Sequence, residues 1–281
     1  MTPPSLIVVN SLVVRGRVGS RAQAFALERL GIEPWLLPTI LLPFHPGHGA
    51  GTRLSVPEAQ FAGLIDDLIA RGLSGVRAVL TGYLGTVEQV PHLLRLIAAA
   101  RAANPDVLVC CDPVIGDAQG LYVDEALALA MLESLVPAAD LLCPNRHELA
   151  WLTGHPVSTN TEIIEAVSTL ASPTVLVTSA HEMMRGNMAN LLVHETRAWL
   201  AEARAIDKPP HGTGDLMSAI FTAFLLAEHA PDAALSRATS CVHDILAATG
   251  PGAEEIALVA AQDRLMSPRM PVSLRTLVQA V

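Results

Sequence analysis

The stretch VLVCCDPVIGD occupies residues 107–117 and indicates the fold of this chain more clearly than any other. Its first five residues are all apolar, without the polar alternation of a strand that has one solvated face. Such a run is typical of a strand buried on both faces. Asp112 and Pro113 end the run at its carboxyl side. The stretch therefore predicts an interior strand of a parallel sheet that helices cover on both faces.

Similar apolar runs recur along the chain, and longer segments with helical periodicity separate them. The expected strands are residues 6–9, 35–37, 78–80, 107–111, 141–143 and 175–177. The expected helices between them are residues 22–30, 58–70, 87–103, 125–135 and 162–170. This alternation predicts an α/β fold with a mostly parallel central sheet covered by helices on both faces.

The pattern changes after residue 177. Residues 188–193 and 198–203 are expected to form a hairpin around His194-Glu195-Thr196. Three further helices are expected at residues 216–228, 233–247 and 256–266. No linker or repeat divides the chain, so residues 1–281 are predicted to form one domain.

Composition narrows the class of protein. Of 281 residues, 51% are hydrophobic and 16% are charged, which is typical of a globular chain with a large core. The net charge of -9 disfavours a nucleic-acid-binding protein. No apolar run approaches the roughly 18 residues of a membrane span, and the N-terminus MTPPS lacks the basic start of a signal peptide. The four cysteines form no Cys-x-x-Cys pair, so reduced thiols in the cytoplasm are expected.

The most informative site motif is Gly212-Thr213-Gly214-Asp215, directly before an apolar helical segment. Two glycines allow backbone N–H groups to converge at a helix N-terminus, where they stabilise the charge of a phosphoryl group in transfer. Asp215 would accept the proton of an attacking hydroxyl, and the helix N-terminus is expected to keep its pKa low. The structural alternative is an ordinary glycine-rich helix start with an acidic first turn.

Two further acidic clusters follow strands. Asp112 and Asp117 could face phosphates and Mg²⁺, although Asp112 could equally cap a turn before proline. Asn145 and Glu148 have the spacing of a helix capping box, and the functional alternative is that both reach Mg²⁺ through water. No P-loop, G-x-G-x-x-G or G-x-S-x-G motif is present, and His181, His194, His211 and His229 are expected at the surface or at caps.

In order and spacing, these clusters resemble the ribokinase superfamily and, more narrowly, its pyridoxal kinases. The opening, residues 10–19, is similar to the family pattern Q-S-H-V-V-x-G-x-x-G, with departures at Asn10 and Leu12. The similarity continues through Thr81-Gly82-Tyr83-Leu84-Gly85, through residues 111–117, Asn145 and Glu148, and Gly212-Thr213-Gly214-Asp215. It thus covers nearly the whole chain.

The resemblance implies an ATP-dependent kinase acting on the 5′-hydroxymethyl group of pyridoxal, as a homodimer. It makes Asp215 the catalytic base and Gly212, Thr213 and Gly214 the anion hole. It implies Mg²⁺ organised by Asp112 and Glu148, through water, often with a monovalent cation. The implied ATP-binding residues are Asp112, Asp117, Tyr122, Cys143, Asn145, Glu148, Thr178 and Ser179. The implied substrate-binding residues are Ser11, His45, Pro46, Tyr83 and Asp215.

One segment departs from the family pattern S-N-H-T-x-Y-G. This chain has Pro43-Phe44-His45-Pro46-Gly47-His48-Gly49, which keeps the histidine but replaces the threonine and tyrosine with Pro46 and His48. A hydroxyl that would bond a substituent of pyridoxal is therefore missing. Subfamily variation and altered substrate choice both explain the departure. A hydroxymethylpyrimidine kinase and a catalytically silent vitamin-binding protein are the alternative functions, and an intact Asp215 disfavours the second.

Overall fold

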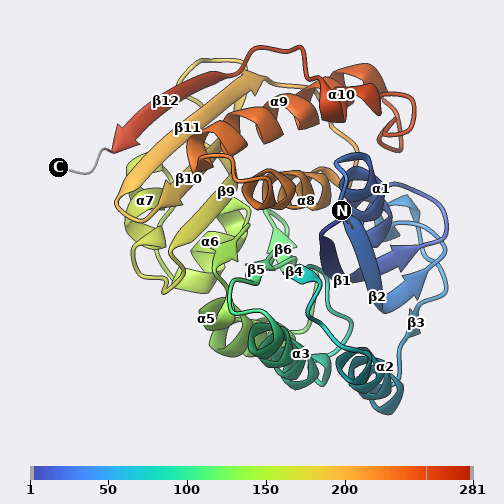
Figure 1. Ribbon diagram of the computed structural model, residues 1–281. Helices are drawn as coiled ribbons and strands as arrows, with labels where there is room; N and C mark the ends of the chain where they lie inside the picture. The colour runs from blue at the N-terminus through green and yellow to red at the C-terminus, as the bar shows by residue number, and fades with distance from the viewer. Residues whose placement is uncertain (1–2, 251, 279–281) are drawn as a thin grey trace.

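A ten-stranded sheet forms the centre of the computed structural model, which describes residues 3–250 and 252–278 (Figure 1). Met1 and Thr2 of the N-terminal stretch considered above lie outside the described residues. In chain order the strands are β1 Ser5–Val13, β2 Glu33–Leu42, β3 Leu54–Ser55, β4 Val76–Thr81, β5 Leu108–Cys111, β6 Gly116–Asp117, β7 Gly120–Leu121, β8 Leu141–Leu142, β9 Thr174–Ala180, β10 Asn187–His194, β11 Arg197–Arg204 and β12 Ser273–Val278.

The spatial order of the main sheet is β12-β11-β10-β9-β8-β5-β4-β1-β2-β3, and β6 and β7 pair in a separate hairpin. The six strands from β9 to β2 are parallel to one another. Antiparallel strands extend the sheet at both ends, where β3 pairs with β2 and β10, β11 and β12 follow β9. The mostly parallel α/β sheet predicted from the sequence is confirmed.

Helices cover both faces of the sheet. Their bounds are α1 Ser20–Arg29, α2 Glu58–Arg71, α3 Gln89–Ala103, α4 Glu125–Ala130, α5 Val136–Ala138, α6 Arg146–Thr153, α7 Asn160–Val167, α8 Thr213–Leu226, α9 Pro231–Thr249 and α10 Asp263–Met266. A 3-10 turn, η1 Pro46–His48, and a π-helical turn, η2 Met131–Leu135, complete the set. Figure 1 shows α2 and α3 on one side of the sheet and α8 and α9 on the other.

Two hydrophobic cores result, one on each face. Along β1, Ile7 and Val9 pack into the core with α2, α3, α6 and α7, whereas Leu6 and Val8 pack into the core with α1, α8 and α9. Successive strand residues point to opposite faces, so a strand buried on both must be apolar throughout. This explains the runs without polar alternation. Within the described residues, no helix is long and apolar enough to cross a membrane.

Several expected elements have different bounds in the structure. β1 is longer than residues 6–9 because the polar residues Asn10 and Ser11 remain in the strand and hydrogen-bond internally. The segment expected as one helix at residues 125–135 divides into α4 and η2. Of residues 256–266, only α10 is helical, because the buried Ile256, Leu258 and Ala261 belong to irregular turns that imitate helical spacing.

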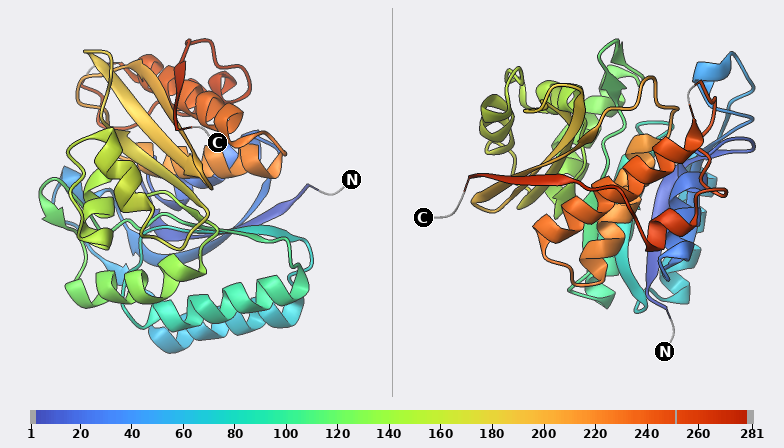
Figure 2. Two further views of the ribbon diagram at one scale, coloured as in Figure 1. Left: turned by 90° about the vertical axis from the view of Figure 1, so that its left-hand side faces the viewer. Right: turned by 90° about the horizontal axis from the view of Figure 1, so that it is seen from above.

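Several elements were not expected as such, among them the short strands β3, β6 and β7, helix α6 and strand β12. Helix α6 is short, and only the capping spacing of Asn145 and Glu148 marks its start. Strand β12 runs along the outer side of β11 (Figure 2) and leaves most of its residues exposed. An edge strand of this kind carries no continuous apolar signal. The expected hairpin is confirmed as β10 and β11, with Glu195 at a φ of 52° in its turn.

The topology indicates where a ligand binds. From β1 the chain moves to β2 on one side and then returns to β4 on the other side of β1. Loops leaving the carboxyl ends of β1 and β4 therefore diverge, and α/β sheets bind ligands in the crevice at such a switch point. Asn10 and Ser11 lie toward the carboxyl end of β1, and Tyr83 follows β4.

Candidate active site

Asp215 lies in the first turn of α8, and its carboxylate reaches across to the switch point. Oδ1 accepts a hydrogen bond of 2.8 Å from Asn10 Nδ2, and Oδ2 accepts one of 2.8 Å from the backbone N–H of Gly19. Gly19 has a φ of 56°, and a Cβ there would meet Ser11 O at 2.4 Å, so only glycine fits this contact. The N-terminal segment and α8 thus hold the carboxylate between them.

The expectation of a low pKa for Asp215 is wrong. Burial raises the pKa of this carboxyl, and the hydrogen bonds from Gly19 and Asn10 oppose the shift without cancelling it. Desolvation penalises the charged form more than these two donors favour it. A raised pKa makes Asp215 a better proton acceptor than an exposed aspartate.

Asn10 is the central hydrogen-bonding residue of the site. Its side chain is fully buried, and its second N–H donates to Gln23 Oε1 at 3.0 Å. Its Oδ1 accepts from the backbone N–H groups of Ser11 at 2.7 Å and Tyr83 at 3.1 Å. Asn10 therefore joins β1, α1, α8 and the segment after β4. Sequence reasoning noted Asn10 only as a departure from the family pattern, although a buried amide in an apolar strand indicates such a role.

The glycines before Asp215 form a helix N-terminus open to an anion. Gly212 adopts a φ of 97°, and a Cβ there would meet Arg17 O at 2.3 Å. Thr213 begins α8, and its Oγ1 donates to Pro210 O at 3.1 Å. A Cβ on Gly214 would meet nothing within 4 Å. The first N–H groups of a helix have no intrahelical acceptor, so they can bind an anion that approaches on this open side.

Asp112 follows β5 and is buried close to Asp215. Burial, followed by the charge of Asp215, raises the pKa of Asp112 to about 8, and a hydrogen bond from Ser218 opposes the shift. Its backbone N–H donates to Thr81 O at 2.8 Å, so the start of the turn is tied to β4. The two carboxyl groups are near enough for the charge of one to disfavour ionisation of the other. A cation placed between them would be strongly favoured.

Asp117 and Tyr122 form a second, outer group on the β6-β7 hairpin. The hydrogen bond from the Tyr122 hydroxyl lowers the pKa of Asp117, whereas burial raises the pKa of Tyr122. Tyr122 is 53% exposed, so its ring lies at the surface. The structure thus brings these two expected nucleotide residues together, apart from the buried Asp112.

Asn145 and Glu148 make the capping box that their spacing predicts. Asn145 Oδ1 accepts from the N–H groups of His147 and Glu148, and Glu148 Oε2 accepts from Asn145 N at 2.8 Å. Glu148 Oε1 also accepts from Ile115 N at 3.0 Å. Burial, followed by the charge of Asp112, raises the pKa of Glu148. The carboxylate of Glu148 therefore joins residues 112–117 to the start of α6 by hydrogen bonds.

The remaining expected nucleotide residues lie along β8 and β9. Thr178 N donates to Pro144 O at 2.9 Å, which continues the parallel pairing beyond β8. Ser179 has a φ of 56°, an unusual backbone state for a residue with a side chain and one that often marks a functional site. The thiol of Cys143 is buried 3.7 Å from Cys110 Sγ. Any contact of Cys143 with a nucleotide would therefore involve its backbone.

The segment from Pro43 to Gly49, which departs from the family pattern, contacts the residue before Gly212 through two stacked histidines. His45, just before η1, stacks on His211 with ring centroids 3.9 Å apart, and His211 directly precedes Gly212. Burial, followed by the charge of His211, lowers the pKa of His45 to about 4. Neutral imidazoles can stack where two charged rings would repel each other. The expectation that His211 is a surface or capping residue is therefore incomplete, since its ring joins two loops of the site.

The other expected substrate residues are Ser11, Tyr83 and Pro46, and two of them contact Asn10. Ser11 is buried beside Asn10, with its Oγ 3.4 Å from Asn10 Oδ1. Tyr83 is half-buried, and its carbonyl accepts from Thr39 Oγ1 at 2.8 Å. Pro46 begins η1 and is exposed. Ser11, Tyr83 and Asp215 are thus linked through Asn10, and His45 joins them through His211.

The carboxylates alone do not make a metal site. Among residues 3–250 and 252–278, no group of three or more His, Cys, Asp or Glu side chains is arranged to hold a metal ion. Asp112 and Glu148 are nevertheless hard oxygen donors of the kind that Mg²⁺ prefers. Mg²⁺ usually keeps several waters and binds with substrate phosphates, so this donor set fits a cation that arrives with a nucleotide.

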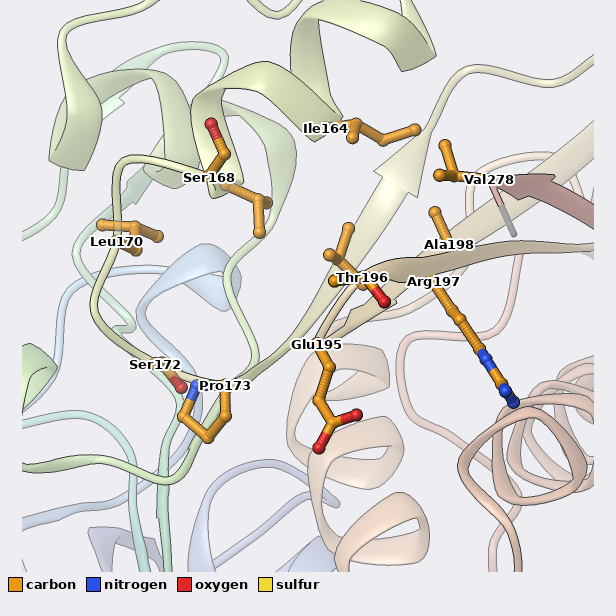
Figure 3. Close-up of a pocket in the computed structure, with 12 residues that line it drawn as sticks. Ile164, Ser168, Leu170, Ser172, Pro173, Glu195, Thr196, Arg197, Ala198 and Val278 are labelled. Carbon is orange, nitrogen blue, oxygen red and sulfur yellow. The ribbon is translucent and has the colours of Figure 1, made fainter. Parts of the chain in front are cut away.

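A pocket of about 300 Å³ lies elsewhere, between α7 and the turn of the β10-β11 hairpin (Figure 3). Ser172, Pro173, Glu195, Thr196 and Arg197 contribute to its lining. These residues are at the amino end of β9, whereas Thr178 and Ser179 are at its carboxyl end. The pocket is therefore at the opposite edge of the sheet from Asp215 and takes no part in the site.

Comparison with known proteins agrees with the geometry. Residues 56–257 match the family described as phosphomethylpyrimidine kinase. The pyridoxine/pyridoxal/pyridoxamine kinase of Bordetella avium is 40% identical over 87% of this chain and 85% of its own. The pyridoxal kinase PdxY of Rubrobacter xylanophilus is 36% identical over 95% and 96%. The structure of pyridoxal kinase from Leishmania donovani in complex with ADP and pyridoxamine superposes with a TM-score of 0.91 at 26% identity, covering 98% and 99%. This chain belongs to the pyridoxal kinase family and has its ribokinase-like fold.

Proposed function

We propose that this protein transfers the γ-phosphoryl group of ATP to the 5′-hydroxymethyl oxygen of pyridoxal. The observation that supports this most is the position of Asp215. Its carboxylate, with a raised pKa, lies at the N-terminus of α8 beside Gly212 and Gly214 and at the switch point of the sheet. Related kinases bind ADP and B6 vitamers, as the Leishmania donovani complex does.

In the proposed reaction, the 5′-hydroxyl oxygen bonds to the γ-phosphorus, and the bond from that phosphorus to the bridging oxygen of ADP breaks. Asp215 accepts the hydroxyl proton. The N–H groups at the start of α8 hold the equatorial oxygens as negative charge accumulates on them. The products are pyridoxal 5′-phosphate and ADP. Positioning and electrostatics supply most of the rate in such transfers, and Asn10 and Gly19 position the base.

We further propose that ATP arrives with Mg²⁺, which neutralises phosphate charge. Asp112 is the better candidate to organise the cation through water, because it lies close to Asp215 and a cation would relieve the repulsion between the two carboxylates. Glu148 already accepts backbone hydrogen bonds with both oxygens, so its contribution to the cation is charge. A monovalent cation nearby remains a prediction of the family resemblance.

Nucleotide contacts are proposed on the outer side of the acidic cluster. Asp117 and Tyr122 on the β6-β7 hairpin would lie near the phosphates or ribose. Asn145, Thr178, Ser179 and the backbone of Cys143 continue the same carboxyl edge of the sheet toward β9. We also propose that the protein is a cytoplasmic homodimer: its free, buried cysteines support the compartment, and the dimer is what the family resemblance implies.

A second candidate function is phosphorylation of hydroxymethylpyrimidine. The substituted loop around Pro46 favours it, because the hydroxyl expected for pyridoxal is missing there. The catalytic base and anion hole would serve either alcohol. A silent vitamin-binding protein is disfavoured, since it would not need a carboxylate beside an anion site.

ATP consumption by the purified protein distinguishes these functions. The assay compares saturating pyridoxal, pyridoxine, pyridoxamine and hydroxymethylpyrimidine, each with Mg²⁺. We expect pyridoxal to be phosphorylated fastest. If hydroxymethylpyrimidine alone stimulates ATP consumption, the vitamin assignment is wrong; if none does, the silent binding protein is supported.

A further inference from the structure

Arg53 holds the hydroxyl of Tyr83. Arg53 lies on the exposed segment between η1 and β3, and its Nη1 donates a hydrogen bond of 2.8 Å to Tyr83 Oη. Its Nη2 donates to Gly85 O at 3.1 Å, and its guanidinium carbon is 5.5 Å from the centroid of the Tyr83 ring. One side chain thus fixes both the tyrosine and the segment after it.

The rest of Tyr83 is also held in place. Its N–H donates to Asn10 Oδ1 at 3.1 Å, and the same asparagine donates to Asp215. Its ring packs against the small apolar cluster of Val13, Val18, Ile40 and Leu42. The backbone of Tyr83 is therefore two hydrogen bonds from the proposed base, and its ring packs beside the same end of β1.

The direction of the bond from Arg53 determines what the Tyr83 hydroxyl can offer. A guanidinium has only donors, so the phenol oxygen must accept from it. The phenolic proton cannot point at Arg53 and is available to another partner. A charged donor also polarises the hydroxyl, which strengthens the hydrogen bond that it donates in turn.

We propose that Arg53 is a positioning residue that makes the Tyr83 hydroxyl a hydrogen-bond donor toward the substrate, so that the site selects a ring substituent that accepts hydrogen bonds. This rests on the proposed function. Pyridoxal differs from pyridoxamine in its 4-substituent, an aldehyde whose oxygen accepts hydrogen bonds. The aminomethyl group of pyridoxamine is protonated at neutral pH and only donates, and the amino group of hydroxymethylpyrimidine is also mainly a donor. Through Tyr83, Arg53 thereby provides the substrate with a hydroxyl partner in place of the threonine hydroxyl that is missing at Pro46.

The test compares pyridoxal with pyridoxamine in binding and in turnover. Calorimetry gives Kd for each vitamer, and a coupled assay gives kcat/KM. The variants are Arg53→Gln, Tyr83→Phe, their double variant and Arg53→Lys, which keeps the charge and one donor. Arg95→Gln is the matched control, because Arg95 is also an exposed arginine. Arg95 lies on α3 and pairs with Asp66 on α2, away from the proposed site. Melting temperatures verify folding.

We expect the wild type to prefer pyridoxal, and Arg53→Gln and Tyr83→Phe each to reduce that preference by about 3- to 10-fold, the range of one hydrogen bond. The double variant should lose no more than the more severe single variant, because both changes remove one interaction. Arg53→Lys should retain part of the preference, and Arg95→Gln all of it. KM for ATP should not change.

Three results would overturn the inference. They are a wild type that prefers pyridoxamine, an Arg53→Gln variant with the wild-type preference, and single effects that multiply in the double variant. Because Kd is measured without turnover, the two proposals can fail separately. A protein that shows the predicted binding preferences but phosphorylates neither vitamer refutes the proposed function and supports the role of Arg53.

Discussion

Two regions of the site differ in how they are built. Around Asp215, buried side chains and backbone groups from β1, α1 and α8 satisfy one another, with Asn10 fully buried at their centre. In the loop from Pro43 to Arg53, most residues are exposed or half-exposed, and contacts with the site are made by a few long or aromatic side chains. The first region keeps the family pattern at Ser11, Gly19 and Asp215 and replaces its glutamine with another amide, Asn10, whereas the second region loses a threonine and a tyrosine to Pro46 and His48.

The difference has a physical cause. A buried polar network tolerates few substitutions, because each one leaves partners without hydrogen bonds in a low dielectric. An exposed loop can exchange residues at little cost, since water replaces any lost partner. Reaction chemistry is therefore fixed in the buried region, and substrate choice can change in the loop.

The largest effect is expected at Asp215. Asp215→Asn keeps the size of the side chain but removes the proton acceptor, so kcat should fall by about 10²–10⁴-fold. Steady-state kinetics with pyridoxal measure the change, and Asp106→Asn, at an exposed turn before β5, is the control. If Asp215→Asn turns over near the wild-type rate, Asp215 is not the base and is only an acidic residue in the first turn of α8.

The next effect is expected at Asn10, and it concerns stability as well as rate. Asn10→Ala removes the hydrogen-bond partner of Asp215 Oδ1, of Gln23 Oε1 and of the Tyr83 N–H, while Gly19 still donates to Asp215 Oδ2. We expect the free energy of unfolding to fall by about 3 kcal/mol, given roughly 1–3 kcal/mol for each unsatisfied group. Urea denaturation measures it. A loss below about 0.5 kcal/mol would show that the network is not as tightly coupled as its geometry indicates.

Glu148 is expected to have a smaller effect, on stability first. Glu148→Gln preserves one acceptor but turns an amide NH₂ toward backbone N–H donors, because both carboxylate oxygens accept such bonds. The free energy of unfolding should fall by about 1–3 kcal/mol. The control is Glu162→Gln, at the start of α7, where a partly exposed glutamate accepts from Ser158 N. Thermal melts of both variants make the comparison.

A Mg²⁺ titration of the same Glu148→Gln variant tests the second role of the residue. If the carboxylate also contributes charge to the cation, the variant needs more Mg²⁺ for half-maximal activity. If the Mg²⁺ titrations of the wild type and the variant superimpose, Glu148 acts only through its hydrogen bonds to the backbone.

The smallest effect is expected in the loop and depends on pH. The pKa of His45 is lowered from its ordinary value of 6.5 to about 4, so its neutral form is the one that stacks on His211. The stabilisation from the stack is fully present above pH 6.5, weakens as the pH falls below that value and is lost as the pH falls through about 4. His48 adds repulsion between protonated rings, whereas Asp117 favours a charged His211. The KM for pyridoxal should rise over this interval.

His45→Phe is the control for the loop, because it keeps a ring for stacking and cannot be protonated. Titration of the vitamin itself affects both proteins equally, so the difference between their KM profiles isolates the histidine. If KM changes with pH in the same way in the wild type and in His45→Phe, the stack of His45 on His211 does not affect substrate binding.

Sequence reasoning worked where the signal is local. The run at residues 107–111 predicts its strand, Gly212 to Asp215 predict a helix start, and Asn145 with Glu148 predict a cap, since each depends on neighbours in the chain. Strand β12 was missed because an exposed edge strand has no apolar pattern.

What the sequence did not predict depends on contacts between distant residues. Asn10 and Asp215 are 205 positions apart, and the bond from Arg53 to Tyr83 spans 30. Neither pairing has a local pattern. The pKa of Asp215 was expected to be low from the helix N-terminus alone, because the amount of burial cannot be determined before the chain is folded.

The central claim is transfer of a phosphoryl group to a bound alcohol, and one measurement tests it most directly. Phosphorus-31 NMR of the purified protein with ATP, Mg²⁺ and pyridoxal resolves ADP, inorganic phosphate and phosphate monoester in one spectrum. The account predicts monoester equal in amount to ADP, with the vitamin recovered as pyridoxal 5′-phosphate. ADP accompanied by an equal amount of inorganic phosphate would show hydrolysis in place of transfer, and an unchanged ATP spectrum would show no catalysis; either result would contradict the account.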